Sequence, residues 1–445
     1  MKNNFLFLLI PSLLFSISIF SQEKTYSFSL EEAIQFALEN NKDANNATRD
    51  IEIAKKQKWE ATASGLPQIS ISGDYQNFLK QQVTLFDTNG DGIDEEFTFG
   101  TSQSVNAFAR LDQKIFDGPY IVALQAAKVF LKISQNAKVK TDSEIRKGVI
   151  SAYGNVLLTE ESVQILIENQ KVLQKNVDET RKIVENGLGE EEDLEQLQIT
   201  LANVTSNLNN TKRLKDVAYK FLNIALGINL NTEVTLTDQL ENLAVQNINN
   251  NLAVEDLVVE NNIDFKIASN NVKAQELQVK LEKSRALPSL NAFINGGYQG
   301  FSDEFSFFDS GQRYFGTSAF GLSLNVPIFS SGERAAKTQR AKIELEKVKA
   351  ELTHTEQQLQ LDLSNARSNY LFAIENYQTS KQNLSLAERI ERKNQVKYTE
   401  GIATSFELRQ AQTQLYTTQQ EYLQAMLDVI NNKAELEVIL NSNTK

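Results

Sequence analysis

The 445-residue chain contains no cysteine and a single histidine, His354. Without cysteine there is no disulfide, no thiol nucleophile and no site for a cysteine-linked lipid. One histidine is too few for a histidine-rich metal site, and it would have to serve alone in any Ser-His-Asp triad. We interpret His354 as a solvated surface residue. These absences count against an enzyme.

The charge balance is acidic, with 57 Asp and Glu against 45 Lys and Arg and a formal net charge of −12. Nucleic-acid binding depends on basic surface, so we expect no nucleic-acid partner. Hydrophobic residues make up 41% of the chain, which is typical of a folded protein.

The N-terminus has the pattern of a cleaved signal peptide, which we assign to residues 1–21. Lys2 precedes an apolar run from Phe5 to Phe20, and the small residue Ser21 stands at the expected cleavage point. The run is shorter than the ~20 residues that a membrane-spanning helix needs, although an uncleaved anchor helix is the alternative. No later apolar run approaches that length. We therefore expect the mature chain to leave the cytoplasm and to cross any membrane with β-strands.

Internal similarity at a nearly constant spacing predicts two repeats. Asn40-Asn41 returns as Asn261-Asn262, Leu66-Pro67 returns as Leu287-Pro288, and Ile115-Phe116 returns as Ile328-Phe329. A later motif returns at one constant spacing: Gly187, Leu194, Gln196, Gln198 and Leu201 correspond to Gly401, Leu408, Gln410, Gln412 and Leu415. We assign residues 22–230 to the first repeat, 231–252 to an asparagine-rich linker and 253–445 to the second repeat.

Each repeat is predicted to contain a helix, a β-hairpin and two long helices. The first helix is expected from Ser29 to about Ser64 and its counterpart from about Val254 to Arg285, each stopped by a Leu-Pro pair. The long helices carry apolar residues every three or four positions without an interrupting proline, as in a coiled coil. The stretch from Glu333 to about Glu400 would span roughly 100 Å as a helix.

Two stretches in each repeat alternate between apolar and polar residues, which is typical of a strand with one apolar face. Such segments of about ten residues fit a membrane barrel that turns its apolar side chains toward lipid. Phe108 and Phe293 depart from the pattern on the polar face, and a soluble hairpin is the alternative. The apolar positions are Ile69, Ile71, Tyr75, Leu79, Val105, Ala107, Ala109, Leu111, Leu290, Ala292, Ile294, Tyr298, Phe320, Leu322, Leu324 and Val326.

Four strands cannot close a membrane barrel, because the smallest such barrels have about eight strands. Two copies would supply eight strands, which leave an interior filled by side chains, whereas three copies would supply twelve. A channel therefore argues for three copies. The predicted fold is mostly α-helical, with long coiled-coil-like helical hairpins, two internal repeats and a four-stranded transmembrane β contribution to a trimeric α/β barrel.

The order and doubled spacing of these motifs resemble the TolC family of outer-membrane factors over nearly the whole mature chain. The resemblance rests on the paired Leu-Pro and Ile-Phe motifs, on GLGEEEDLEQLQ at 187–198 and on YTEGIATSFELRQAQ at 398–412. It implies a homotrimer in the outer-membrane lipid bilayer, with its helices in the periplasm. It also implies an exit duct for efflux or type I secretion, with a periplasmic adaptor and an inner-membrane pump as partners. A trimeric surface adhesin or coiled-coil stalk is the alternative from another class, and an adaptor protein is a third.

The resemblance further implies a gate at the turns that contain Gly187 and Gly401. Asp193 and Glu407 each follow one of these glycines by six residues, and Tyr398 matches a tyrosine that helps to hold the family's closed state.

The best-known member has an arginine where this chain has Ala403, so its tyrosine–arginine–carboxylate contact is not expected in the same form. Glu190, Glu191 and Glu192 crowd beside the first turn. In several converging copies they would form a carboxylate ring that favours cations. The alternative is a solvated helix N-terminus, where acids are favoured in any case.

Residues 87–94 resemble part of a calcium-binding loop. The candidate oxygen ligands Asp87, Asn89, Asp91 and Asp94 alternate around a turn, as Ca²⁺ sites require. The twelfth position is Thr98 instead of glutamate, so the loop is no complete EF-hand, and a turn-rich surface loop is the alternative. We expect no other cofactor.

Overall fold

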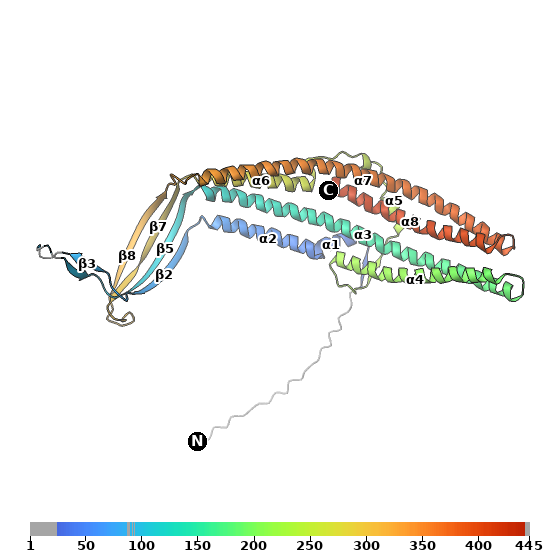
Figure 1. The fold of residues 1–445 in the computed structure, drawn as a ribbon, viewed down its shortest axis with the longest axis horizontal. Coiled ribbons are helices and arrows are strands. Elements are labelled where there is room, and N and C mark those ends of the chain that lie inside the picture. Colours follow the sequence, from blue (N-terminus) through green and yellow to red (C-terminus); the bar gives the residue numbers. More distant parts are fainter. Residues whose placement is uncertain (1–24, 87–89, 91, 93, 441–445) are drawn as a thin grey trace, which may run out of the picture. The chain divides into compact units, whose positions relative to one another are not determined.

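The computed structural model describes residues 25–86, 90, 92 and 94–440, and the described chain is mostly helical, as expected (Figure 1). The signal peptide assigned to residues 1–21 lies outside the described residues. The strands are β1 (Tyr26–Phe28), β2 (Gln68–Asn77), β3 (Val83–Phe86), β4 (Glu95–Thr98), β5 (Gln103–Asp117), β6 (Val234–Leu236), β7 (Ser289–Ser302) and β8 (Tyr314–Asn325). The helices are α1 (Leu30–Asn40), α2 (Lys42–Ala63), α3 (Gly118–Glu185), α4 (Glu191–Leu226), α5 (Leu240–Gln246), α6 (Ile263–Ser284), α7 (Glu333–Thr399) and α8 (Ser405–Leu440).

The chain forms two compact units. Among the described residues, the first unit consists of 25–41, 148–248 and 375–431, and the second of 42–147, 249–374 and 432–440. The first unit contains both turns between long helices, and the second contains the largest sheet.

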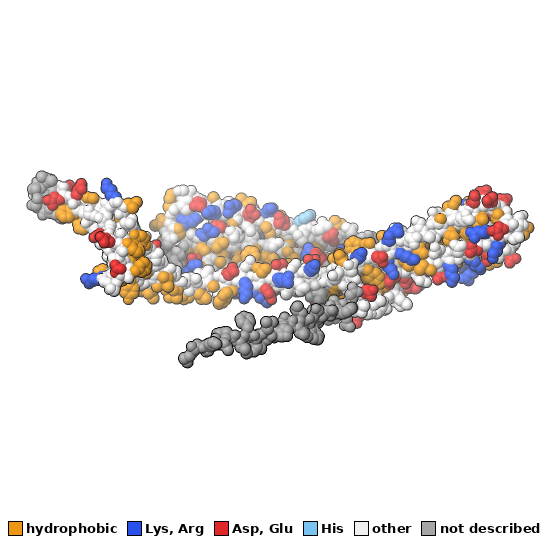
Figure 2. All heavy atoms as spheres, turned by 90° about the horizontal axis from the view of Figure 1, so that it is seen from below, with side chains coloured by type: hydrophobic (Ala, Val, Ile, Leu, Met, Phe, Trp, Pro, Cys, Tyr) orange, Lys and Arg blue, Asp and Glu red, His pale blue; other side chains and the backbone are white. Residues whose placement is uncertain are grey.

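The largest sheet has four antiparallel strands in the order β2-β5-β7-β8 (Figure 1). Its register places Ile69, Leu111, Ile294 and Phe320 side by side across the four strands. These residues belong to the predicted apolar face, and Ile69 and Phe320 are 74% and 69% exposed. Hydrophobic side chains accordingly gather on the surface of the sheet, whereas charges of both signs are spread along the helices (Figure 2). The alternation predicted from the sequence is therefore present, and its apolar face is uncovered within the described chain.

The two phenylalanines on the polar face each pack over a glycine of the neighbouring strand. The ring of Phe293 fills the space above Gly321, and the carbonyl of Ala107 and the ring of Phe108 together fill the space above Gly297. The Arg110 guanidinium lies 4.4 Å from the centre of the Phe293 ring. An aromatic ring over a strand glycine restores packing that the missing side chain would leave open. These residues therefore serve the packing of the sheet.

The strands differ from the sequence prediction in four places. β2 ends at Asn77, so Leu79 lies beyond it and is 99% exposed. β8 ends at Asn325, so Val326 also lies outside its predicted strand. A β-bulge between Lys114 and Phe116 shifts the register of β5, so that Phe116 pairs with Leu290. The predicted loop after β2 contains the additional hairpin β3–β4, which alternation over four residues was too short to reveal.

The helix expected from Ser29 to about Ser64 is broken at Asn41. Ser29 caps α1 as predicted, in a capping box with Glu32. The backbone of Asn41 is extended, and its side-chain amide donates a 2.8 Å hydrogen bond to the carbonyl of Ala225. Asparagine can exchange helical geometry for a side-chain hydrogen bond of this kind, which ends the helix.

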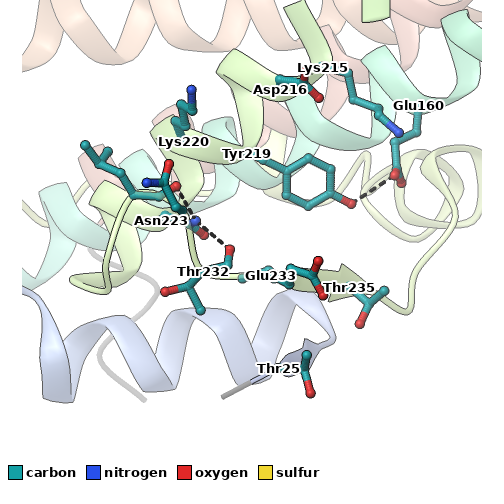
Figure 3. A pocket seen from close by; sticks show the side chains of 13 residues that line it. Thr25, Glu160, Lys215, Asp216, Tyr219, Lys220, Asn223, Thr232, Glu233 and Thr235 are labelled. Atoms are coloured by element: carbon teal, nitrogen blue, oxygen red, sulfur yellow. Dashed lines mark hydrogen bonds between the residues drawn. The ribbon is translucent and has the colours of Figure 1, made fainter. Parts of the chain in front are cut away.

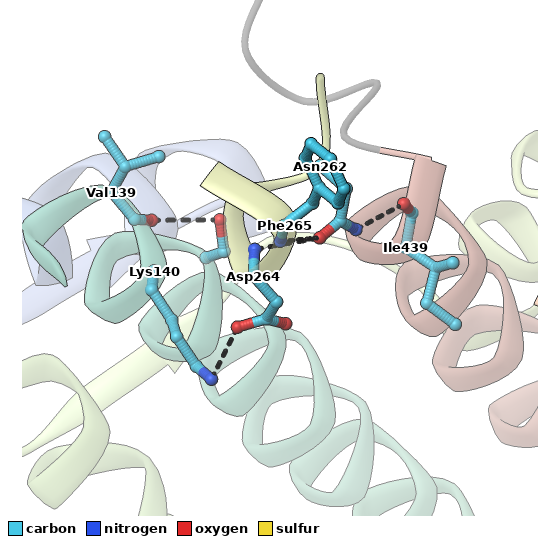
Figure 4. A network of polar contacts seen from close by, with 7 residues as sticks. Val139, Lys140, Asn262, Asp264, Phe265 and Ile439 are labelled. Atoms are coloured by element: carbon cyan, nitrogen blue, oxygen red, sulfur yellow. Dashed lines mark hydrogen bonds and ion pairs between the residues drawn. The ribbon is translucent and has the colours of Figure 1, made fainter. Parts of the chain in front are cut away.

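The counterpart helix begins at Ile263, later than the expected Val254. The side chain of Asn262 accepts hydrogen bonds from the N–H groups of Asp264 and Phe265 and so caps α6. Its amide donates a 2.9 Å hydrogen bond to the carbonyl of Ile439, while Asp264 forms a 2.7 Å ion pair with Lys140 (Figure 4). Asn41 and Asn262 therefore make the same kind of contact, a side-chain amide donating to a distant backbone carbonyl, at equivalent positions of the two predicted repeats.

The segment that was expected to be a linker contains folded elements. β6 pairs in parallel with β1, and α5 follows it. Asp238 accepts a 2.7 Å hydrogen bond from the N–H of Leu30 at the start of α1, and the buried hydroxyl of Tyr153 lies 2.9 Å from the same carboxylate. These contacts tie residues 234–246 to the rest of the first unit.

No helix in the described ranges is both long enough and apolar enough to span a membrane.

Candidate functional site: the turns between the long helices

The turn between α3 and α4 and the turn between α7 and α8 have the same backbone conformation. Gly187 and Gly401 have φ angles of 73° and 72°, in the left-handed region that favours glycine. The residue after each glycine donates its N–H to a helical carbonyl, Leu188 to Ile183 over 3.0 Å and Ile402 to Lys397 over 2.8 Å. This is the Schellman pattern that ends helices, and it explains why both turns carry glycine at the same repeat position.

Glu407 is committed to capping α8. Its carboxylate accepts a 2.8 Å hydrogen bond from the N–H of Thr404, and its own N–H donates to the Thr404 hydroxyl over 3.3 Å. This reciprocal arrangement is a capping box. The hydrogen bonds to Thr404 lower the pKa of the Glu407 carboxyl from its ordinary value of 4.5. Glu407 therefore stabilises the turn within its own hairpin.

Asp193 occupies the corresponding position in the first turn of α4 but makes a different contact. The residue at the N-cap, Glu190, forms no side-chain capping bond. Asp193, in the hairpin of α3 and α4, instead accepts a hydrogen bond from the hydroxyl of Ser405, which is 4% exposed and belongs to the hairpin of α7 and α8. The structure thus assigns the two predicted acids to different tasks, one inside a hairpin and one between the hairpins.

Tyr398 also links the two hairpins. Its hydroxyl lies 2.7 Å from the hydroxyl of Thr180 on α3. Burial raises the pKa of Tyr398 above its ordinary value, so the side chain is uncharged at neutral pH. The side chain of Ala403 cannot take the place of the family arginine, and the partner that Tyr398 finds in this chain is Thr180.

A row of buried polar residues on α3 continues this link and was not predicted from the sequence. Ser162, Asn169, Asn176 and Thr180 follow one another at intervals of seven, seven and four positions along the helix, and each is buried. Their partners on α7 and α8 are Gln420, Gln419, Gln395 and Tyr398, respectively.

Asn176 and Gln395 exchange two hydrogen bonds, of 3.0 and 3.1 Å. Buried asparagines at such spacing fix the register of packed helices, because any slip leaves an amide unpaired. The sequence signal that could have revealed these buried polar residues is their heptad spacing within an apolar seam that includes Leu166 and Leu173.

Glu190, Glu191 and Glu192 are exposed beside the first turn, and Glu192 accepts a 3.0 Å hydrogen bond from Gln196. Their clustering within one chain agrees with the sequence, but a carboxylate ring requires further copies and stays a prediction.

The calcium loop also stays a prediction. Asp87, Asn89 and Asp91 lie outside the described residues, and Asp94 alone of the four candidates lies within them. The described ranges contain no cluster of three or more His, Asp or Glu side chains that could hold a metal ion.

A polar cavity of about 660 Å³ lies between α3, α4 and β6 in the first unit. The hydroxyl of Tyr219 points across it and donates a 2.9 Å hydrogen bond to Glu160, while Asn223 donates to the carbonyls of Leu230 and Thr232 (Figure 3). The positive charges of Lys215 and Lys220 partly balance the negative charges of Glu160, Asp216 and Glu233 in its lining. Its groups bind mainly one another, so we assign this cavity a structural role.

The profile of the outer membrane efflux protein family matches this chain twice, over residues 33–227 and 255–442. The chain belongs to that family. The protein is therefore a component of an export channel in the outer membrane, and it is not an enzyme. The surface-adhesin alternative is not favoured.

Relatives with described roles agree with this family. The chain is 21% identical over 408 residues to TtgC of Pseudomonas putida, a probable efflux pump outer membrane protein, covering 92% of this chain and 82% of that one. It is also 21% identical over 423 residues to the alkaline protease secretion protein AprF of Pseudomonas aeruginosa, covering 93% and 85%.

Solved structures share the fold at low sequence identity. Crystal structures of CusC match with a TM-score of 0.74 at 18% identity, covering 93% of this chain and 92% of that chain. The outer membrane protein VceC of Vibrio cholerae matches with a TM-score of 0.71 at 17% identity, covering 92% and 95%.

We predict that Glu407→Gln lowers the thermal stability at neutral pH and that this difference disappears in acid. Glutamine keeps the capping hydrogen bonds but lacks the charge that favours a helix N-terminus. Because the folded-state pKa of Glu407 is lowered, its charge stabilises the fold above pH 4.5 and loses this effect as the pH falls through the folded value. Melting curves in detergent between neutral pH and pH values well below 4.5 measure the difference.

Glu400→Gln is the matched control, since Glu400 is exposed in the second turn and caps no helix. A melting difference for Glu407→Gln that is the same at all pH values would contradict the assignment.

Proposed function

We propose that three copies of this chain form one continuous exit duct, with twelve strands in the outer membrane and the long helices in the periplasm. The observation that carries the proposal is the open four-stranded sheet. Within the described chain, β2 and β8 each pair along one edge only. Unpaired backbone groups in lipid cost several kcal/mol each, so a sheet in a membrane must close on itself.

A ring of copies satisfies both edges with one kind of contact. The four strands alternate in direction, so β8 of one copy can pair in antiparallel fashion with β2 of the next. Such a head-to-tail interface forms a closed ring when its rotation fits a whole number of copies. Twelve strands leave an open interior, whereas eight leave one filled by side chains. The apolar face would then meet lipid, and the polar face, with Arg110 and Asp112, would line the channel.

The internal duplication supports the same proposal. The contact of Asn41 with Ala225 in the first repeat has its counterpart in the contact of Asn262 with Ile439 in the second. Two repeats per chain supply six similar units in a trimer. The 68 residues of α3 correspond to about 100 Å, long enough to reach deep into the periplasm.

The partners that we propose are a periplasmic adaptor and an inner-membrane pump. Support comes from the family and from the relatives, whose names describe an efflux pump and a protease secretion system. The duct itself would be passive and gated at the turns of the first unit.

We predict that a bis-maleimide cross-linker joins chains that carry both Ser72→Cys on β2 and Thr317→Cys on β8. Because the native chain has no cysteine, every cross-link reports this pair of edges. Denaturing gels of the membrane-inserted protein should show dimers and trimers and nothing larger. Each single-cysteine variant is the matched control and should remain monomeric on the gel. Monomers alone, or a ladder beyond three chains, would contradict a closed trimer.

We predict that Tyr398→Phe raises the single-channel conductance, because it removes a hydrogen bond that holds the two hairpins together. The bond with Thr180 should contribute about 1 kcal/mol, measurable as a coupling energy with Thr180→Val. Tyr416→Phe is the matched control: Tyr416 lies on α8 in the same unit, and its hydroxyl has no hydrogen bond in the described part of the chain. Equal conductances for Tyr398→Phe and Tyr416→Phe would rule out this contact as part of the gate.

A further inference from the structure

A cationic pocket of about 450 Å³ lies in the second unit between the end of α6 and the beginning of α7. The two helices run side by side there (Figure 1), and Gln275 on α6 donates a hydrogen bond to the carbonyl of Ala341 on α7. Lys283 on α6 and Arg334 and Lys342 on α7 supply three positive charges to its lining. Helical side chains lean toward the N-terminus of their own helix. Lys283 and Lys342 therefore lean toward one another from two antiparallel helices.

The positive charge of the pocket is largely uncompensated. Within the described part of the chain, the side-chain ammonium groups of Lys283 and Lys342 form no ion pair and no hydrogen bond. Arg334 is held by the carbonyls of Pro327 and Ile328, at 2.7 and 3.2 Å, and by the hydroxyl of Ser330. These neutral partners fix the guanidinium and leave its charge in place.

The acid in the lining is already paired. The Glu282 side chain is 5% exposed, and its carboxylate lies 3.3 Å from the Arg285 guanidinium and accepts a hydrogen bond from Gln278. Its charge is therefore matched from outside the pocket. The three cations remain available for an anion, together with the amide of Gln339.

Exposed apolar residues adjoin the pocket on the side of the sheet. Ile328 and Phe329 follow β8 and are 88% and 86% exposed, and Arg334 comes five positions after Phe329. Lys283 precedes the first residue of β7 by six positions. The headgroup layer on each side of a bilayer is about 5–8 Å thick. If the sheet spans the hydrocarbon layer, the pocket lies at the level of the phosphates.

We propose that this pocket binds the phosphate of an anionic phospholipid in the leaflet that faces the periplasm. Lys283 and Lys342 contact the phosphate, fixed Arg334 supplies the third charge, and Ile328 and Phe329 lie among the acyl chains. Basic pockets between helices at a membrane surface bind such headgroups, and long lysine side chains reach toward them. The apolar residues beside the cations favour a lipid over free phosphate. The proposal rests on the placement of the sheet in the outer membrane.

Native mass spectrometry of the detergent-purified protein tests this proposal with added phosphatidylglycerol or phosphatidylcholine. We expect up to one phosphatidylglycerol per chain, at lipid concentrations where phosphatidylcholine does not bind. Lys283→Gln combined with Lys342→Gln should weaken phosphatidylglycerol binding roughly tenfold, because each lysine near a membrane surface contributes several-fold to anionic lipid binding. Excess inorganic phosphate should not displace the lipid.

The matched control is Lys347→Gln combined with Lys349→Gln, which removes the same charge from α7 outside the pocket. Equal losses in the two double variants would show general charge attraction and would overturn the proposal. Unchanged binding in the Lys283/Lys342 variant would also overturn it, as would displacement by inorganic phosphate. The same spectra report the number of chains in each particle. Failure of lipid binding in an intact trimer is therefore distinguishable from failure of the trimeric duct.

Discussion

The hydrogen-bonding groups along the outer edges of β2 and β8 constrain the rest of this molecule. A four-stranded antiparallel sheet with one exposed apolar face is stable neither in water, where the face would aggregate, nor alone in lipid, where the edges would be unpaired. The proposed closure with neighbouring copies would remove both costs. Phe108 beside Gly297 and Phe293 over Gly321 already pack the polar face of the sheet within a single chain.

Two positions that correspond in the predicted repeats make different contacts in the first unit, which agrees with the proposed gate. Glu407 caps its own helix, whereas Asp193 accepts a hydrogen bond from Ser405 of the opposite hairpin. Tyr398 and the polar row on α3 add contacts between hairpins that are hydrogen bonds and not apolar packing. Such contacts specify one register, because a slip of one helix along the other leaves buried polar groups unpaired.

Much of the fold was predictable because its signals are periodic. The two-residue alternation predicted the four strands of the sheet. Apolar residues at every third or fourth position, with no interrupting proline, predicted the long helices α3 and α7. The break at Asn41 was not predictable from periodicity, since a single side-chain hydrogen bond to Ala225, distant in sequence, decides it. The bulge beside Phe116 likewise depends on pairing with β7.

Only those residues of the candidate site that belong to sequence motifs could be predicted. Both glycines, Tyr398 and the two acids follow from the sequence, and the structure places all five in the first unit. Their partners Thr180 and Ser405 do not, because these two hydrogen bonds depend on how distant helices meet. The Thr404–Glu407 capping box is local, and its Thr-x-x-Glu pattern was a signal in the sequence that was missed. The cationic pocket was missed for the same reason, since Lys283 and Lys342 are ordinary surface residues until α6 and α7 lie side by side.

Hydrogen exchange of the backbone amides tests the central claim most directly. In the purified assembly, the outer-edge amides of β2 and β8 should exchange as slowly as those of β5 and β7, because neighbouring copies pair them. Fast exchange confined to β2 and β8, beside protected β5 and β7, would show that the sheet stays open and would contradict the account.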